Sequence, residues 1–243
     1  NLSVLGVTTN GGFADYAVSN YQHAYKLPAS MPYDVGALVE PLAAAYNAIA
    51  KLEVGTDSYV AIFGPGTLGL AMVKMAKARG ARKVVMIGTR DYRLQMAKDM
   101  GADEVVNTKE VGSPHYTDNL IERMKELGNG ELANRVIVPA SSLAAHDDAF
   151  RISTGGAILV FLAVTGPTEK VGIPMLESLI LDKTIKFSLW YPNQFPRTID
   201  FLEQHQDSLR TLITHHGKLD SLSNDIGRQA SRDNSVLKTI ISL

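Results

Sequence analysis

Residues 58–69 read SYVAIFGPGTLG and join three structural signals in one short stretch. The first six residues are an apolar run rich in β-branched and aromatic side chains, which is typical of a buried strand. Gly64, Gly66 and Gly69 then complete the pattern G-x-G-x-x-G. Apolar residues at helical spacing run from residue 68 to Gly80, and glycine favours a helix C-terminus. The stretch predicts a strand, a glycine loop and a helix in that order.

This order of elements is the context in which the glycine pattern binds a dinucleotide. Gly64 permits a tight turn, Gly66 lets the backbone approach a pyrophosphate, and Gly69 allows the helix to pack closely on the strand. The first turn of the helix, which includes Thr67 and Leu68, offers amide donors and a partial positive charge to phosphates. The alternative is a glycine-rich turn that binds no ligand.

Strands and helices alternate along the central part of the chain. Apolar runs predict further strands at 83–87, 104–107, 135–138, 157–163 and 184–190. Helical spacing predicts helices at 68–80, 92–100, 117–127 and 142–152. This alternation is typical of βαβ units around a parallel sheet, and continuously apolar strands indicate helices on both faces. Residues 41–190 are therefore predicted to form an α/β domain with a doubly wound parallel Rossmann sheet.

The end of the second strand bears on the choice between NAD(H) and NADP(H). An acidic residue about twenty positions after the glycine motif would bind the ribose of NAD and repel a 2′-phosphate. Here Gly88 takes that position, followed by Thr89 and Arg90, with Arg93 close by. A glycine leaves room for a phosphate, and threonine and arginine can donate hydrogen bonds to it. These residues favour NADP(H) over NAD(H); in the alternative, both arginines are solvated charges and Asp91 binds the ribose.

Residues that follow the strand predicted at 135–138 are also candidates for cofactor binding, because ligands bind at the carboxyl ends of parallel strands. Pro139 and Ala140 are expected to approach the cofactor. Ser141 and Ser142 fit better as a helix N-cap than as catalytic groups. His146, like the other scattered histidines outside 212–216, is expected at the surface.

The flanks differ from this central region. Residues 1–40 contain an alternating strand pattern at 13–18, and residues 191–243 contain a helix at 195–204. The remaining C-terminal elements are expected as strands at 212–214 and 236–242 and a helix at 221–229. Neither flank is large enough to fold alone, so the two are predicted to pack together as one second domain.

Composition excludes several classes of function. The 243 residues include no cysteine, which excludes disulfides, thiolate metal sites and a cysteine nucleophile within this sequence. The net charge of -1 gives no reason to expect nucleic acid or an anionic membrane as partner. The longest apolar run, 157–164, is far shorter than the roughly 20 residues that span a bilayer. No charged and apolar leader opens the sequence, and a cytoplasmic location is expected.

Short motifs spread over the whole chain resemble the zinc-dependent medium-chain alcohol dehydrogenases, in particular the sorbitol, threonine and butanediol dehydrogenase branch. The matching segments are GGFADY at 11–16, YKLP at 25–28, ALVEPL at 37–42, MAKDMGAD at 96–103, YPN at 191–193 and LITH at 212–215. Several motifs in the family's order are more specific than the glycine pattern alone.

The resemblance implies an enzyme that moves hydride between a nicotinamide and an alcohol, polyol or ketone while zinc polarises the oxygen. It implies that residues 1–40 and 191–243 are remnants of a GroES-like β-rich catalytic domain. By position, Glu40 would be a metal ligand in an intact enzyme; the alternative is a buried, hydrogen-bonded carboxylate near the cleft. The family's other zinc ligands and catalytic residues are expected upstream of Asn1, so this fragment is expected to lack zinc and to be inactive alone. Trp190 stands where that branch has arginine, which argues against a polyol substrate.

Two other functions stay open from the sequence: a non-enzymatic NADP(H)-binding module and a zinc-independent enzyme resembling quinone reductases. The Glu40-Pro41 segment favours the zinc-dependent branch. The resemblance also implies a homodimer or homotetramer. The strand at 184–190 would lie at the edge of the sheet and could pair with a second copy.

Overall fold

In the computed structural model, residues 4–163, 166, 168–231 and 235–242 are described. The chain divides into two compact units. One consists of residues 39–198, and the other joins residues 1–38 to residues 199–243.

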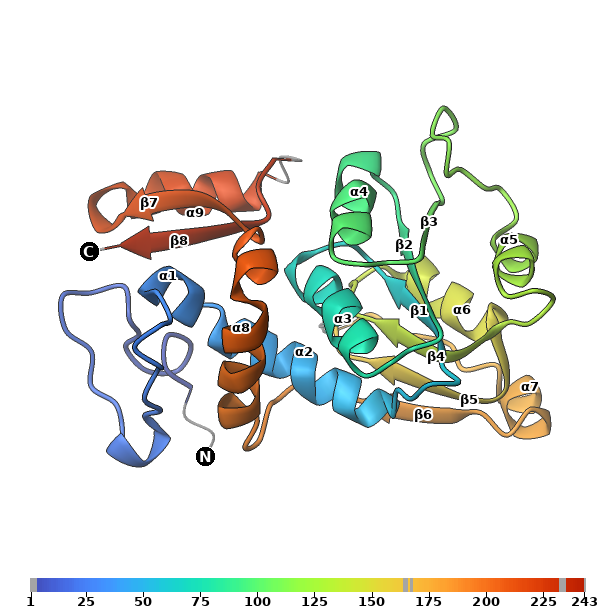
Figure 1. The fold of residues 1–243 in the computed structure, drawn as a ribbon, viewed down its shortest axis with the longest axis horizontal. Helices are drawn as coiled ribbons and strands as arrows, with labels where there is room; N and C mark the ends of the chain where they lie inside the picture. The colour runs from blue at the N-terminus through green and yellow to red at the C-terminus, as the bar shows by residue number, and fades with distance from the viewer. Residues whose placement is uncertain (1–3, 164–165, 167, 232–234, 243) are drawn as a thin grey trace. The chain divides into compact units, whose positions relative to one another are not determined.

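The 39–198 unit is built on a parallel sheet of six strands in the order β3-β2-β1-β4-β5-β6 (Figure 1). The strands are β1 (Tyr59–Phe63), β2 (Lys83–Gly88), β3 (Glu104–Asn107), β4 (Ala133–Val138), β5 (Ser153–Phe161) and β6 (Thr184–Phe187). This order confirms the predicted doubly wound sheet, because the chain runs outward from β1 to β3 and then restarts at β4 beside β1.

Helices cover both faces of this sheet. They are α2 (Val39–Leu52), α3 (Thr67–Ala78), α4 (Asp91–Asp99), α5 (Leu120–Leu127) and α6 (Leu143–Arg151), and the short helix α7 (Met175–Ile180) precedes the edge strand β6. Figure 1 shows α3 and α4 on one side of the sheet, with α5 and α6 on the other. All five residues of β1 are buried. Tyr59 packs in one cluster with Met124 of α5 and Phe150 of α6, and Ile62 faces the other way because side chains alternate along a strand.

The strands and helices predicted within residues 58–190 are found, and three of them differ from the prediction by three or more residues at one end. The helix expected from residue 117 begins at Leu120, because the Asn119 side chain accepts a hydrogen bond from the amide of Glu122 and caps it. The strand expected over 157–163 begins at Ser153 and ends at Phe161. The strand expected over 184–190 ends at Phe187, and the residues after it are bonded to α2 instead.

Helix α2 was not predicted from the sequence. Pro41 lies in its first turn, where a proline breaks no hydrogen bond of the helix. Leu42, Ala45 and Ile49 are completely buried on the helix. The proline therefore marks the start of a helix here and not a loop.

The other unit holds a parallel pair of strands, β7 (Ile213–Lys218) and β8 (Lys238–Ser242), joined through α9 (Leu222–Ala230). Its short elements are η1 (Tyr21–His23), α1 (Tyr33–Gly36) and η2 (Leu219–Ser221). Helix α8 (Phe195–Arg210) begins in the 39–198 unit and continues into this one, with a non-helical residue at His205. It is longer than the helix predicted at 195–204.

The prediction of a strand at 13–18 is wrong. These residues form bends and extended backbone, and Tyr16 and Val18 are more than nine-tenths exposed. An alternating pattern yields a strand only where another strand accepts its backbone hydrogen bonds. Within residues 4–163, 166, 168–231 and 235–242, no strand pairs with this segment. None of the helices formed by these residues is both long and apolar enough to cross a membrane.

Candidate functional site

The predicted glycine loop connects β1 to α3 at the carboxyl edge of the sheet. Its first amide, Gly64 N, donates a 2.8 Å hydrogen bond to the carbonyl oxygen of Ile87, which ties the loop to the end of β2. Gly66 is the N-cap of α3, and a Cβ built there would meet no atom within 4 Å. The first amides of a helix have no acceptor within the helix. Open space therefore lies beside Gly66 at this helix N-terminus, and Thr67 and Leu68 form the first turn next to it.

Gly64 and Gly69 are needed for packing within the loop. A Cβ at Gly69 would overlap the carbonyl oxygen of Gly64. Gly64 has a φ of +96°, and a Cβ there would lie 2.9 Å from the Cβ of Ala140. Pro139 and Ala140 directly follow β4, and the structure brings Ala140 against the glycine loop. They meet where β1 and β4 are neighbours and the strand order reverses, which is where such sheets bind ligands.

Gly88 is the last residue of β2 and is buried. A Cβ at this position would lie 2.8 Å from Cδ of Pro65 in the glycine loop. Glycine is thus required here so that Pro65 can pack on the strand end. Pro65 fills the space that a side chain at residue 88 would occupy. Any contact with a phosphate would therefore be made by the residues after Gly88.

Thr89, Arg90 and Arg93 follow this strand end. Thr89 is exposed, and Arg90 is the N-cap residue of α4, with Arg93 in the first turn. Partial burial, together with the positive charge of Arg90, lowers the pKa of the Arg93 guanidinium. Two guanidinium groups are therefore close enough to influence each other at this end of α4, beside the carboxylates of Asp91 and Glu110, and each can donate hydrogen bonds to an anion.

Asp91, the alternative ribose ligand, is already hydrogen-bonded. Its Oδ1 accepts from Nδ2 of Asn107 at 2.7 Å and from Oγ of Ser113 at 2.6 Å. Hydrogen bonds from Ser113 and then Asn107 lower the pKa of this carboxyl group. The backbone amide of Asp91 donates to Oε2 of Glu110 at 3.1 Å. The carboxylate therefore contacts the loop after β3.

Glu40 lies in the first turn of α2 and is exposed, so the alternative of a buried carboxylate is wrong about its burial. That alternative is correct about hydrogen bonding, because Tyr191 Oη donates to Glu40 Oε1 at 2.8 Å. Burial, followed by the bond to Glu40, raises the pKa of Tyr191 to about 12. The ring of Tyr191 also stacks on Phe195, with centroids 5.3 Å apart.

A zinc ion in a catalytic site takes three protein ligands. Across the part of the chain that the structure describes, no three His, Asp or Glu side chains come together in a way that could hold a metal. His215 and His216 lie on β7, opposite Thr239 and Ile240 of β8. The described residues therefore do not fit a resident zinc ion. Glu40 is a single carboxylate, and it accepts a hydrogen bond from the phenol group of Tyr191.

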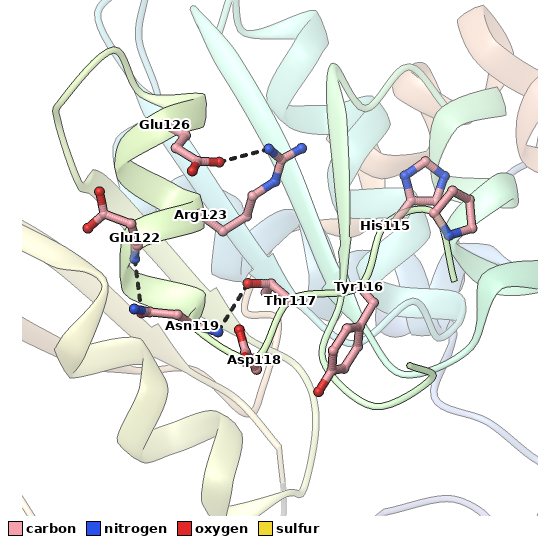
Figure 2. A pocket seen from close by; sticks show the side chains of 9 residues that line it. His115, Tyr116, Thr117, Asp118, Asn119, Glu122, Arg123 and Glu126 are labelled. Carbon is pink, nitrogen blue, oxygen red and sulfur yellow. Dashed lines mark hydrogen bonds and ion pairs between the residues drawn. The ribbon is translucent and has the colours of Figure 1, made fainter. Parts of the chain in front are cut away.

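A separate hollow of about 370 Å³ lies between α5 and the loop before it (Figure 2). Its labelled side chains are His115, Tyr116, Thr117, Asp118, Asn119, Glu122, Arg123 and Glu126. Arg123 pairs with Glu126 at 3.0 Å, and Thr117 Oγ1 accepts from the amide of Asn119. These bonds stabilise the start of α5, and the hollow shares no residue with the glycine loop.

The structure adds residues that the sequence did not single out. Asn47, buried in α2, donates to Oγ of Ser188 at 3.0 Å and to the carbonyl oxygen of Trp190 at 2.6 Å, which fixes the segment before Tyr191.

His146 is buried and stacks on Phe161, so its expected surface position is wrong. The N-cap role of Ser142 is confirmed by its bond to the amide of Ala145.

Comparisons with known proteins bear on this site. The family model described as "Zinc-binding dehydrogenase" matches residues 67–204. The chain is 27% identical to the sorbitol dehydrogenase of Bacillus subtilis over 96% of its own length and 64% of that protein's length. It therefore spans slightly less than two thirds of this relative.

Two solved structures have the same fold. An alcohol dehydrogenase of Escherichia coli CFT073, complexed with NADH, is 24% identical with a TM-score of 0.89, over 99% of this chain and 68% of that one. A zinc-binding dehydrogenase of Sinorhizobium meliloti, bound to NADP, is 23% identical with a TM-score of 0.88, over 100% of this chain and 69% of that one. The glycine loop, the strand order and the family match agree: the chain belongs to the zinc-binding dehydrogenase family.

Proposed function

We propose that the 39–198 unit binds a nicotinamide adenine dinucleotide, with NADP(H) preferred over NAD(H), as the cofactor-binding part of an alcohol or carbonyl oxidoreductase. The observation that carries this proposal is the glycine loop. Gly66 opens the N-terminus of α3 to a ligand at the point where β1 and β4 are neighbours. The pyrophosphate would lie over the amides of residues 66–68, and Pro139 and Ala140 would flank the nicotinamide half.

The preference for NADP(H) is supported by the residues after β2. Arg90 and Arg93 are close enough for one to affect the pKa of the other, and Thr89 is exposed beside them. Asp91 directs its carboxylate to Asn107 and Ser113. A 2′-phosphate would therefore meet two guanidinium groups, while Oδ1 of the Asp91 carboxylate is already engaged by Asn107 and Ser113.

The chemistry that we propose is hydride transfer between the nicotinamide and the carbon of a small alcohol, polyol or ketone. This chain contributes cofactor binding and orientation. Since its described residues make no metal site, we assign it no step that uses zinc, and we expect little or no dehydrogenase activity from the chain alone. Glu40 would serve as a metal ligand only together with ligands from outside this sequence. The non-enzymatic module and the quinone-reductase-like enzyme are the alternatives.

Calorimetric titration of the chain with NADPH and, separately, NADH tests the cofactor proposal. We expect NADPH to bind at least about tenfold more tightly, since a phosphate paired with arginine adds charge-assisted hydrogen bonds. The double variant Arg90→Ala, Arg93→Ala should remove this difference and leave NADH binding within about twofold. Arg228→Ala, in the other unit, is the matched control. Equal or tighter NADH binding by the wild-type chain would overturn the NADP(H) assignment.

We also propose a second copy of the chain as partner. Strand β6 is an edge of the sheet, and α7 before it exposes Leu176, Leu179 and Ile180 by more than seven-tenths. Phe187 at the end of β6 is exposed to a similar extent. An exposed edge strand beside apolar side chains is suited to pairing across a two-fold axis. Sedimentation equilibrium should show a dimer that Leu176→Glu, Leu179→Glu dissociates, whereas Val111→Glu, at an exposed loop position, does not.

A further inference from the structure

Asn107 organises a network of hydrogen bonds at the ends of β2 and β3. It is the last residue of β3, is completely buried, and pairs in register with Gly88. Its Nδ2 donates to Asp91 Oδ1 at 2.7 Å and to Glu110 Oε2 at 3.0 Å. Its Oδ1 accepts from the amides of Lys109 and Glu110, each at 2.9 Å. The side chain thus joins the start of α4 to the loop after β3.

This loop is itself fixed to the sheet. The backbone of Asn107 donates to the carbonyl oxygen of His115 at 2.8 Å and accepts from the amide of Thr117 at 3.0 Å. The amide of Thr108 donates to the carbonyl oxygen of Gly88 at 2.9 Å. Residues 108–116 consequently form a closed loop beside the strand end that carries the proposed phosphate site.

Ser113 provides a further hydrogen bond to the Asp91 carboxylate. Its hydroxyl donates to Oδ1 at 2.6 Å, so that one carboxylate oxygen accepts from both Ser113 and Asn107. The main chain adds a third bond, since the amide of Asp91 donates to Glu110. Hydrogen bonds to an ionised carboxylate are about twice as strong as those between neutral groups. Asp91 is therefore held toward the loop by strong bonds on both its main chain and its side chain.

We propose that Ser113 and Asn107 are positioning residues that set the cofactor preference by holding the Asp91 carboxylate away from the adenine ribose. A carboxylate free to turn at the start of α4 would accept bonds from ribose hydroxyls and repel a 2′-phosphate. Held against the loop, it leaves the strand end to Thr89, Arg90 and Arg93. This inference rests on the proposed NADP(H) binding and names the residues that maintain its selectivity.

Titration of the full chain with NADPH and NADH tests the inference in Ser113→Ala. Ser113 is the better target because replacing Asn107 would remove four side-chain hydrogen bonds from a buried position. We expect the NADPH-to-NADH affinity ratio to fall by about fivefold, mainly through tighter NADH binding by the released carboxylate. Adding Asp91→Asn to Ser113→Ala should restore the wild-type ratio. Thr117→Ala, directly after the 108–116 loop and with no hydrogen bond to Asp91 among the described residues, should leave the ratio unchanged.

The outcomes separate this inference from the proposed function. If the wild-type chain prefers NADPH and Ser113→Ala keeps the full preference, the inference is overturned and the proposed function stands. If the ratio stays low in the double variant, Asp91 is not the responsible group and the inference is again overturned. A wild-type chain that prefers NADH overturns the proposed function itself. Asp91→Asn alone gives a second test that does not depend on the folding of Ser113→Ala: NADH affinity should stay within about twofold, and a clear loss would show that Asp91 already binds the ribose.

Discussion

The segments 59–63 and 13–18 both have a sequence typical of a strand, yet only the first forms one. Residues 59–63 become β1, which pairs with β2 and β4 and is buried along its whole length. Residues 13–18 lie exposed, with Phe13, Tyr16 and Val18 in contact with solvent. The difference lies in the partners and not in the local pattern, because a strand is stabilised by neighbours that accept its hydrogen bonds and cover its apolar face.

The same difference separates the two units. Every strand of the 39–198 sheet except those at its edges has a parallel neighbour on both sides, and helices cover both faces. Among its described residues, the other unit has one pair of strands and exposes several large apolar side chains between residues 5 and 21. We therefore expect the stability of this chain to reside mainly in the 39–198 unit.

The largest expected effect compares β1 with the exposed segment directly. Ile62→Ala removes a completely buried side chain and should lower the free energy of unfolding of the 39–198 unit by about 4 kcal/mol. Val18→Ala removes a side chain that is 91% exposed and should change stability by less than about 0.5 kcal/mol. Urea unfolding followed by fluorescence of Trp190, the single tryptophan, measures the 39–198 unit, and circular dichroism measures both units. Comparable losses in the two variants would show that residues 13–18 are packed in solution.

A second prediction compares a glycine from each unit. Gly69→Ala places a Cβ on the carbonyl oxygen of Gly64, so it should cost about 2–3 kcal/mol and abolish NADPH binding. Gly227→Ala lies in α9, where a Cβ meets no atom within 4 Å, and should stabilise its helix by about 0.5–1 kcal/mol. Thermal melting by circular dichroism and NADPH titration measure both variants. NADPH binding by Gly69→Ala at wild-type affinity would contradict the close packing of the loop.

The sequence predicted the sheet and the glycine loop because both depend on local signals. The strands of 39–198 are continuous apolar runs, and Gly64, Gly66 and Gly69 fall at a fixed spacing between a strand and a helix. These features need no knowledge of distant residues. Helix α2 was missed although its pattern is also local, because Pro41 was not recognised as a residue of the first turn.

The parts that escaped prediction depend on contacts between residues far apart in sequence. Asp91 is bonded to Asn107 and Ser113, which follow it by 16 and 22 positions. Glu40 and Tyr191 are separated by 151 positions. No spacing rule joins such residues, so the direction of the Asp91 carboxylate could not be decided from the sequence. The packing of Pro65 against Gly88 could not be predicted for the same reason, because it depends on the register between β1 and β2.

The smallest expected effect concerns the pH dependence of the bonds to Asp91. Its pKa is lowered from the ordinary value of 3.8, so the folded chain favours the ionised carboxylate. A group with a lowered pKa stabilises the fold above its unfolded pKa, and this contribution disappears as the pH falls through the folded value. The melting temperature of the wild-type chain should therefore exceed that of Asp91→Asn at pH 6. The two curves should converge as the pH falls below about 4.

Melting curves between pH 6 and pH 3 measure this difference, and Asp15→Asn is the matched control. Asp15 lies in the exposed segment 13–18 of the other unit. Among the contacts of the described residues, it makes no hydrogen bond to Asn107 or Ser113. Its variant should track the wild-type chain at every pH. If Asp91→Asn also tracks the wild type, the bonds from Ser113 and Asn107 do not favour the ionised carboxylate. These hydrogen bonds would then be too weak to keep the carboxylate from a ribose. The comparison between the hydrogen-bonded end of β2 and the exposed segment 13–18 would lose this support.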